Sequence, residues 1–240
     1  GLDGKREPLT RVEEMAACYI KEIRAVLPEG PFLLGGASFG GRVAFEMARQ
    51  LHAIGQKVAL VALLDAFAPG SPGSLPKLTV MRRRLTSYRA RAAFHLRNLL
   101  LGPERRKYIW KKSRTLLRRI RNRLWQAMYK SYERMARPLP QVLQNVGEAG
   151  YLASRRYRPK TYPGQVTLFR AGVRSIGEGT NNEMGWAKLA LGGVVIREVA
   201  GDHVNMLVEP HVRTLAEQLR DCIDRATEAE AAKEFAASAV

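Results

Sequence analysis

A short apolar run that passes through glycines into a helical pattern constrains the fold of this chain more than any other feature. The apolar run covers residues 31–34, glycines follow at 35–36, and an amphipathic run extends over 43–51. This order predicts a strand over 31–34, a sharp turn, and a helix over 41–53, with Ser38 at the tip of the turn. Residues without a Cβ atom suit such a turn, because they let a strand and a helix pack closely.

The turn also matches a short chemical motif. Gly36-Ala37-Ser38-Phe39-Gly40 fits the pattern G-x-S-x-G and resembles the nucleophile elbow of α/β-hydrolases. In that interpretation the turn lifts the Ser38 oxygen above the sheet edge, and the backbone N–H of Phe39, at the start of the helix, receives a developing oxyanion. The alternative is a glycine-rich turn that carries an incidental serine.

Later segments extend the same alternation of strands and helices. An apolar strand is predicted over 58–64, further strands over 164–170 and 193–199, and a closing helix over 209–223. Since the first strand, helix and second strand follow one another directly, the sequence predicts an α/β fold with a mostly parallel sheet flanked by helices. The second strand is apolar throughout, as expected for a strand that is buried on both faces.

Composition shifts divide the chain. A Pro-, Gly- and Ser-rich stretch over 68–77 marks a boundary, and a helical, basic pattern follows it. We therefore expect an α/β-hydrolase core formed by 1–70 and 151–223, interrupted by a basic helical lid insertion over 71–150. Residues 224–240 are expected to form a tail, either a frayed helix or a linker.

Composition also excludes several classes of protein. The chain has 240 residues, 46% of them hydrophobic, which is enough for a full core. It contains no run of about 18 apolar residues, so no membrane-spanning helix is expected. Cys18 and Cys222 are far apart and give neither a disulfide framework nor metal-ligand spacing. We expect a protein of the reducing cytoplasm, without a metal or redox cofactor.

A serine nucleophile needs a base, and the base needs an acid that orients it. His203 lies in a loop directly after the last predicted strand, where a hydrolase base belongs. The other three histidines lie in a helical or basic segment: His52, His95 and His211. The alternative for His203 is an exposed loop residue or a cap of the next helix.

Asp65 is the first candidate for the acid. It directly follows strand 58–64, and the carboxyl ends of parallel strands meet at one edge of a sheet. Glu178 and Glu183 compete from the loop after strand 164–170, whereas Asp202 adjoins His203 and is interpreted as a loop residue. The order Ser38, Asp65, His203 matches the hydrolase order.

Three segments together carry a closer resemblance. Residues 30–51, 61–65 and 201–212 resemble the elbow, the acid-bearing strand and the histidine loop of the thioesterase domains that end nonribosomal peptide and polyketide synthases. The resemblance favours Asp65 over Glu178. It implies that Ser38 attacks an acyl thioester held on the phosphopantetheine arm of a carrier protein, with release by hydrolysis or cyclisation.

The resemblance also reveals a departure. Family members carry further strands before the segment that starts here, with a loop that supplies a second oxyanion N–H. We therefore expect this chain to be a fragment of a longer polypeptide, with the second donor outside it. A non-enzymatic alternative is a binding module whose triad is idle.

The charge is concentrated in the expected insertion. Residues 80–137 hold 19 Lys or Arg and two acidic residues, so they carry +17 of the net charge of +18. Three interpretations remain open: a lid with a solvated charged face, a docking surface for an acidic carrier protein, or a surface for anionic membrane or nucleic acid. Nucleic acid is the partner we expect least.

Overall fold

A computed structural model describes most of the predicted core and part of the remaining chain. It describes residues 8–70, 146–173 and 182–238, together with positions scattered between 117 and 140. Most of the expected lid insertion lies outside these residues, so the lid stays a prediction.

The chain forms two compact units. One comprises residues 9–74 and 150–240, and the other comprises 1–8 and 75–149. The first unit contains all the strands of the described residues and every residue proposed for the site.

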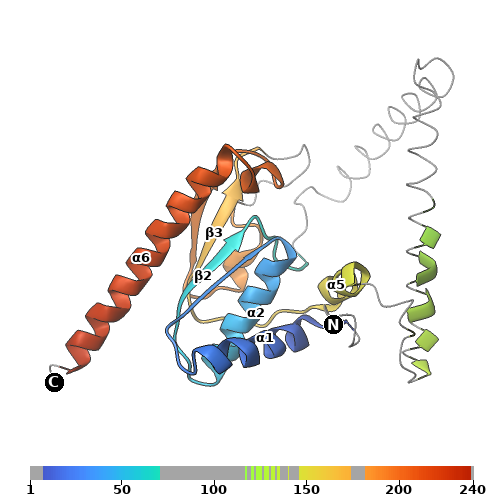
Figure 1. The fold of residues 1–240 in the computed structure, drawn as a ribbon, viewed down its shortest axis with the longest axis horizontal. Coiled ribbons are helices and arrows are strands. Elements are labelled where there is room, and N and C mark those ends of the chain that lie inside the picture. Colours follow the sequence, from blue (N-terminus) through green and yellow to red (C-terminus); the bar gives the residue numbers. More distant parts are fainter. Residues whose placement is uncertain are drawn as a thin grey trace, which may run out of the picture. The chain divides into compact units, whose positions relative to one another are not determined.

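A parallel sheet lies at the centre of this unit (Figure 1). Among the described residues it has four strands: β1 (Phe32–Ala37), β2 (Val58–Leu64), β3 (Val166–Ala171) and β4 (Val194–Val199). They lie in the order β1-β2-β3-β4, and every neighbouring pair is parallel. The predicted α/β class is confirmed, and β2 has the predicted bounds.

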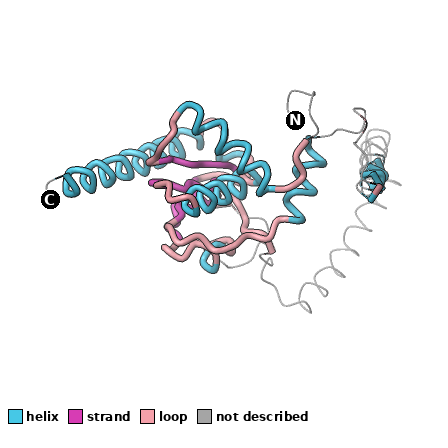
Figure 2. Tube along the Cα trace, turned by 90° about the horizontal axis from the view of Figure 1, so that it is seen from below, coloured by secondary structure: helices cyan, strands magenta, loops and turns pink. Residues whose placement is uncertain are grey.

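Helices cover both faces of the sheet (Figure 2). The helices α1 (Val12–Val26) and α2 (Phe39–Ala53) pack on one face, and α6 (His211–Ser238) packs on the other. The helix α5 (Val146–Arg156) precedes β3 in the chain and carries Ser154. No helix among the described residues is long and apolar enough to cross a membrane.

The apolar side chains of β2 serve two separate cores. Val61 and Leu63 pack in the core beneath α1 and α2, whereas Leu60 and Ala62 pack in the core beneath α6. Successive side chains of a strand point to opposite faces, so a strand covered on both sides needs apolar residues at every position. This is why polar and apolar residues do not alternate along β2.

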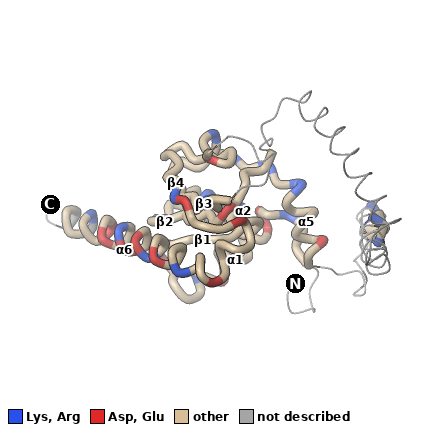
Figure 3. Tube along the Cα trace, turned by 90° about the horizontal axis from the view of Figure 1, so that it is seen from above, with Lys and Arg blue, Asp and Glu red and all other residues tan. Residues whose placement is uncertain are grey.

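The last helix is longer than the sequence predicted. We expected the closing helix to end at 223 and a frayed helix or linker to follow, but α6 continues without a break to Ser238. The added residues are rich in Ala and Glu, which are strong helix formers. Side chains of both signs follow one another along α6 (Figure 3), and Arg225–Asp221 and Lys233–Glu230 pair one turn apart, at 2.8 and 2.6 Å.

A buried carboxylate joins α2 to the residue that follows α5. Glu46 is 1% exposed, and its oxygens accept hydrogen bonds from Arg49 (2.6 and 2.9 Å), Gln50 (2.8 Å) and the Tyr157 hydroxyl (2.9 Å). Burial alone would raise the pKa of Glu46, but these hydrogen bonds outweigh it and the pKa is lowered. Burial and the neighbouring Glu46 charge raise the pKa of Tyr157. The cluster therefore holds an ionised carboxylate inside the fold.

Candidate active site

Ser38 occupies a strained turn between β1 and α2. Its backbone has φ 50° and ψ −112°, and Phe39 is the first residue of α2. A positive φ is unfavourable for a residue with a side chain, so the flanking elements must hold it. The Ser38 N–H contributes to this by donating to the carbonyl oxygen of Leu64, at the end of β2, at 2.9 Å.

Two glycines make the turn possible. A Cβ atom on Gly36 would lie 2.3 Å from the carbonyl carbon of Gly40, and one on Gly41 would lie 2.5 Å from the Cβ of Ala66. By contrast, a Cβ atom on Gly40 would meet nothing within 4 Å. The strand and the helix therefore cross so closely that side chains are excluded at Gly36 and Gly41 but not at Gly40.

Asp65 lies at the carboxyl end of β2, next to Ser38. Its backbone also has a positive φ, 43°, and its N–H donates to the carbonyl oxygen of Phe169 at 2.7 Å. One carboxylate oxygen accepts the N–H of Ala171, at the end of β3, at 3.1 Å. The Asp65 side chain is 9% exposed. The hydrogen bonds between the ends of β2 and β3 therefore hold a nearly buried carboxylate in place.

His203 lies in the loop after β4 and contacts the same acid. Its Nδ1 is 2.7 Å from the second carboxylate oxygen of Asp65. An ionised carboxylate can only accept, so Nδ1–H donates, and in the neutral ring Nε2 carries the free lone pair. Half of the His203 side chain is exposed, which leaves this nitrogen accessible to a substrate.

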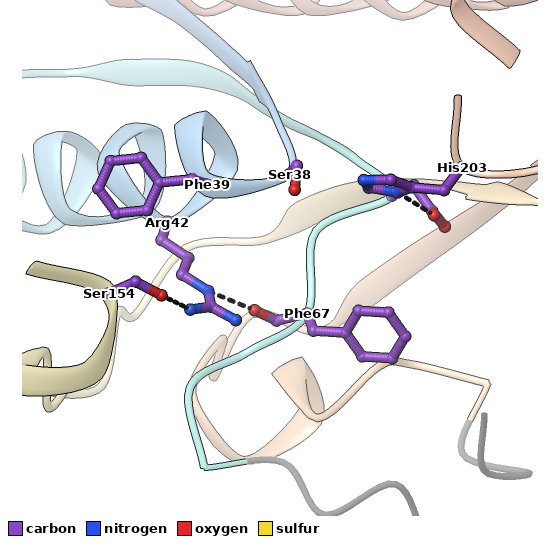
Figure 4. Close-up of a pocket in the computed structure, with 7 residues that line it drawn as sticks. Ser38, Phe39, Arg42, Phe67, Ser154 and His203 are labelled. Carbon is purple, nitrogen blue, oxygen red and sulfur yellow. Dashed lines mark hydrogen bonds and ion pairs between the residues drawn. The ribbon is translucent and has the colours of Figure 1, made fainter. Parts of the chain in front are cut away.

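Ser38, Asp65 and His203 line one cavity of about 360 Å³, shared with Phe39, Arg42, Phe67 and Ser154 (Figure 4). All three lie where a strand of the parallel sheet ends, at one edge, as the sequence predicted from strand order. No hydrogen bond joins the Ser38 hydroxyl to the His203 ring among the described residues. The cavity therefore gathers a serine, an imidazole and a carboxylate, while their catalytic roles stay a proposal.

The structure tests one of the two competing glutamates. Glu183 does not line the cavity, and Glu178 is outside the described residues. The Asp202 carboxylate accepts the backbone N–H groups of Val204 and Asn205 at 2.9 and 2.8 Å. These hydrogen bonds lower the pKa of Asp202. Asp202 therefore shapes the His203 loop, in agreement with its interpretation as a loop residue.

Three residues that line the cavity were not predicted from the sequence: Arg42, Phe67 and Ser154. The Arg42 Nε donates to the carbonyl oxygen of Phe67 at 2.9 Å, and its Nη1 donates to the Ser154 hydroxyl. The spacing of four residues from Ser38 places Arg42 one helical turn along α2, and this signal was available in the sequence. Ser154 lies 112 residues from Arg42 in the chain, and no local pattern predicts their contact.

No cluster of three or more metal-ligating side chains occurs in the part of the chain that the structure describes. The polar groups at the cavity are suited to acyl transfer by a nucleophile, a base and an orienting acid.

A parallel sheet covered by helices, with a serine elbow facing an imidazole and a carboxylate, has the architecture of an α/β-hydrolase. The model of the thioesterase domain family matches residues 2–223, so the chain belongs to that family. The family resemblance predicted from residues 30–51, 61–65 and 201–212 is thereby confirmed.

Similar proteins include large synthases. Chondramide synthase cmdD of Chondromyces crocatus is 30% identical over 226 residues, which cover 90% of this chain and 6% of that synthase. The dimodular nonribosomal peptide synthase of Bacillus subtilis (strain 168) is 49% identical over 65 residues, covering 27% of this chain and 3% of that protein. The chain thus spans only a small part of the length of the curated relatives it matches.

Solved structures show the same fold. The NocB thioesterase domain, in covalent complex with a fluorophosphonate nocardicin G analog, is 25% identical with a TM-score of 0.53, and the match covers 93% of this chain and 77% of that one. The four-domain nonribosomal peptide synthetase AB3403 is 22% identical with a TM-score of 0.56, covering 89% of this chain and 16% of that one. This second likeness supports the fold alone.

Proposed function

We propose that this domain releases an acyl, peptidyl or polyketide chain from a phosphopantetheine thioester through an acyl-enzyme on Ser38. The observation that carries the proposal is the shared cavity, in which a strained serine faces the hydrogen-bonded pair of His203 and Asp65. Membership of the thioesterase domain family supports a thioester as the bond that is cleaved.

The first half-reaction transfers the acyl group to the enzyme. The Ser38 oxygen attacks the thioester carbonyl while Nε2 of His203 takes the hydroxyl proton. Asp65 holds the ring and stabilises the imidazolium that forms. The N–H of Phe39, which has no acceptor within the first turn of α2, donates to the oxyanion. The carbon–sulfur bond then breaks, and the imidazolium returns its proton to the leaving thiolate.

The second half-reaction frees the enzyme. His203 removes a proton from the acceptor oxygen or nitrogen, which attacks the Ser38 ester, and the proton returns to the Ser38 oxygen. Water as acceptor gives a free acid, whereas a hydroxyl or amine of the acyl chain gives a ring. The exposed side of His203 admits either acceptor.

The partner that fits this reaction is an acidic acyl or peptidyl carrier protein. The similar proteins include a nonribosomal peptide synthase and a polyketide synthase, which supports a substrate delivered on a carrier. The basic segment over 80–137 would attract an acidic carrier, and an anionic membrane surface is the competing partner.

Thiol release from an acyl-pantetheine thioester tests the activity. We expect turnover by the wild type and a loss of about 10⁶-fold in Ser38→Ala, because the nucleophile is removed. Ser154→Ala is the matched control: it removes another hydroxyl of the same cavity but keeps the nucleophile, so its turnover stays within about tenfold. Equal turnover in Ser38→Ala and wild type would refute the proposal, and ring or acid products would identify the acceptor.

A further inference from the structure

Arg42 places a positive charge at the cavity that contains Ser38. It follows Ser38 by one turn of α2, lines the cavity and is half-buried (Figure 4). Burial lowers the pKa of Arg42, but a guanidinium remains protonated in proteins. A permanent cation therefore lies beside the proposed nucleophile.

This cation has only neutral partners among the described residues. Its two hydrogen bonds go to a backbone carbonyl, that of Phe67, and to a hydroxyl, that of Ser154. Asp65 is the acid at the same cavity, and both of its oxygens are already bonded, one to Ala171 and one to His203. A partly desolvated charge without an anionic partner is unfavourable, and an anionic ligand would relieve this cost.

The two hydrogen bonds also orient the guanidinium. Nε and Nη1 are held by acceptors on the loop after β2 and on α5, which fixes the plane of the group. A guanidinium has five N–H donors, so Nη2 and the second hydrogen of Nη1 remain for a ligand. A fixed, planar pair of donors matches the two oxygens of a carboxylate.

We propose that Arg42 binds an anionic group of the acyl chain, so that the domain prefers acyl chains carrying a carboxylate near the thioester. This inference rests on the proposed function, because it assigns the substrate class of the same cavity. The phosphate of the phosphopantetheine arm is a second anionic group, but it lies at the end of the arm opposite the thioester. Arg42 lines the same cavity as Ser38, on which the acyl group is carried in the proposed mechanism.

Binding of non-hydrolysable analogues tests the inference without requiring turnover. The probes are pantetheine amides, with nitrogen in place of the thioester sulfur, that carry succinyl, adipoyl or suberoyl groups. Each is paired with the neutral acyl group of equal carbon number, and calorimetry gives the two dissociation constants. We expect the wild type to bind at least one carboxylate probe about tenfold more tightly than its neutral partner, as a charge-assisted hydrogen bond would give.

Variants assign this preference to the guanidinium. Arg42→Gln should abolish it, and Arg42→Lys should retain part of it through charge alone. Ser154→Ala should weaken it without abolishing it, because the cation remains but loses one of the two hydrogen bonds that fix its plane. Arg213→Gln, on the exposed surface of α6, is the matched control and should bind as the wild type does. Melting curves report whether each variant is folded.

Three results would overturn the inference. They are a wild type without preference at any chain length, an Arg42→Gln protein that keeps the preference, and a preference that requires a phosphate on the pantetheine. To check the last result, the dissociation constants of carboxylate and neutral probes are compared again with phosphopantetheine amides in place of pantetheine amides. A clear carboxylate preference in a protein that never cleaves thioesters would instead contradict the proposed function alone.

Discussion

The hydrogen bond between His203 and Asp65 defines the chemistry at the scale of single residues. Asp65 lies 2.7 Å from Nδ1 and accepts the backbone N–H of Ala171 at 3.1 Å, so its carboxylate holds the imidazole in one orientation. In the proposed mechanism Nδ1–H donates to Asp65, which leaves Nε2 as the base. In that mechanism the acid fixes the base and does not take up a proton.

Asp65→Asn should consequently impair catalysis while preserving the fold. An asparagine of the same shape favours the wrong imidazole tautomer, and we expect kcat to fall by about 10³–10⁴-fold. Asp202→Asn is the control, because Asp202 adjoins His203 but bonds only its own loop; its kcat should stay within about tenfold. An Asp65→Asn protein as active as the wild type would show that Asp65 does not orient the base.

Two glycines of the turn around Ser38, Gly36 and Gly40, allow the effect of one added Cβ atom on protein stability to be tested. Gly36→Ala should destabilise the protein strongly, because its Cβ would overlap backbone atoms of Gly40 that cannot move aside. Gly40→Ala, in open space on α2, should cost less than about 1 kcal/mol. Urea unfolding of both variants measures the difference, and similar stabilities would contradict the close crossing of β1 and α2.

At the scale of elements, the Glu46 cluster ties α2 to the segment after α5. The Glu46 carboxylate accepts hydrogen bonds from Arg49, Gln50 and Tyr157, and the Tyr157 hydroxyl comes from 111 residues away in the chain. At the cavity, Arg42 comes from α2 and Ser154 comes from α5, three residues before Tyr157. The cluster therefore helps to position one wall of the proposed site.

Glu46→Gln should lower the free energy of unfolding by about 1–3 kcal/mol at pH 7. The donors on Arg49, Gln50 and Tyr157 bond to two carboxylate oxygens of Glu46, whereas a glutamine offers them only one acceptor oxygen. The folded-state pKa of Glu46 is lowered, so its contribution is complete above the ordinary glutamate pKa, about 4.3, and is lost as pH falls through the folded value. The gap between variant and wild type should narrow accordingly in acid. Urea titrations across pH measure it.

The exposed Glu209→Gln is the control for this series, because Glu209 pairs with Arg213 at the surface of α6. Surface pairs contribute about 0–1 kcal/mol, so its effect should be small. A gap for Glu46→Gln that stays constant or widens as pH falls would contradict the ionised, hydrogen-bonded state of Glu46.

Local patterns allowed the elements to be predicted, but contacts between distant segments could not be. The bounds of β2 follow from its apolar run. Asp65 and His203 could be named as candidates because Asp65 directly follows β2 and His203 lies in the loop after β4. The Arg42–Ser154 contact could not be predicted, since it depends on how α2 and α5 pack. The sequence left residues 224–240 open between a frayed helix and a linker, because their Ala- and Glu-rich composition has no apolar stripe to bury, and the structure continues α6 to Ser238.

At the scale of the whole molecule, the charge is unevenly divided between the segments. Residues 80–137 carry +17 of the net +18, so the rest of the chain is close to neutral. Charge of this density would accelerate encounter with an acidic carrier and would be screened by salt. On the proposed function, the docking of a carrier is thus separable from the chemistry at Ser38.

Salt dependence should distinguish the two steps. Raising the ionic strength from about 0.05 to 0.5 M should lower kcat/KM for a carrier-linked acyl group by about tenfold, and it should change kcat/KM for the same acyl group on free pantetheine little. Paired steady-state measurements check this. An equal response of both substrates would argue against electrostatic docking.

In the proposed mechanism Ser38 becomes acylated. The most direct measurement is mass spectrometry of the protein after brief incubation with an octanoyl-pantetheine thioester and an acid quench. We predict a mass increase of one octanoyl group, located by peptide mapping on Ser38 and absent from Ser38→Ala. An adduct on another residue, or thiol release by Ser38→Ala at the wild-type rate, would contradict the claim.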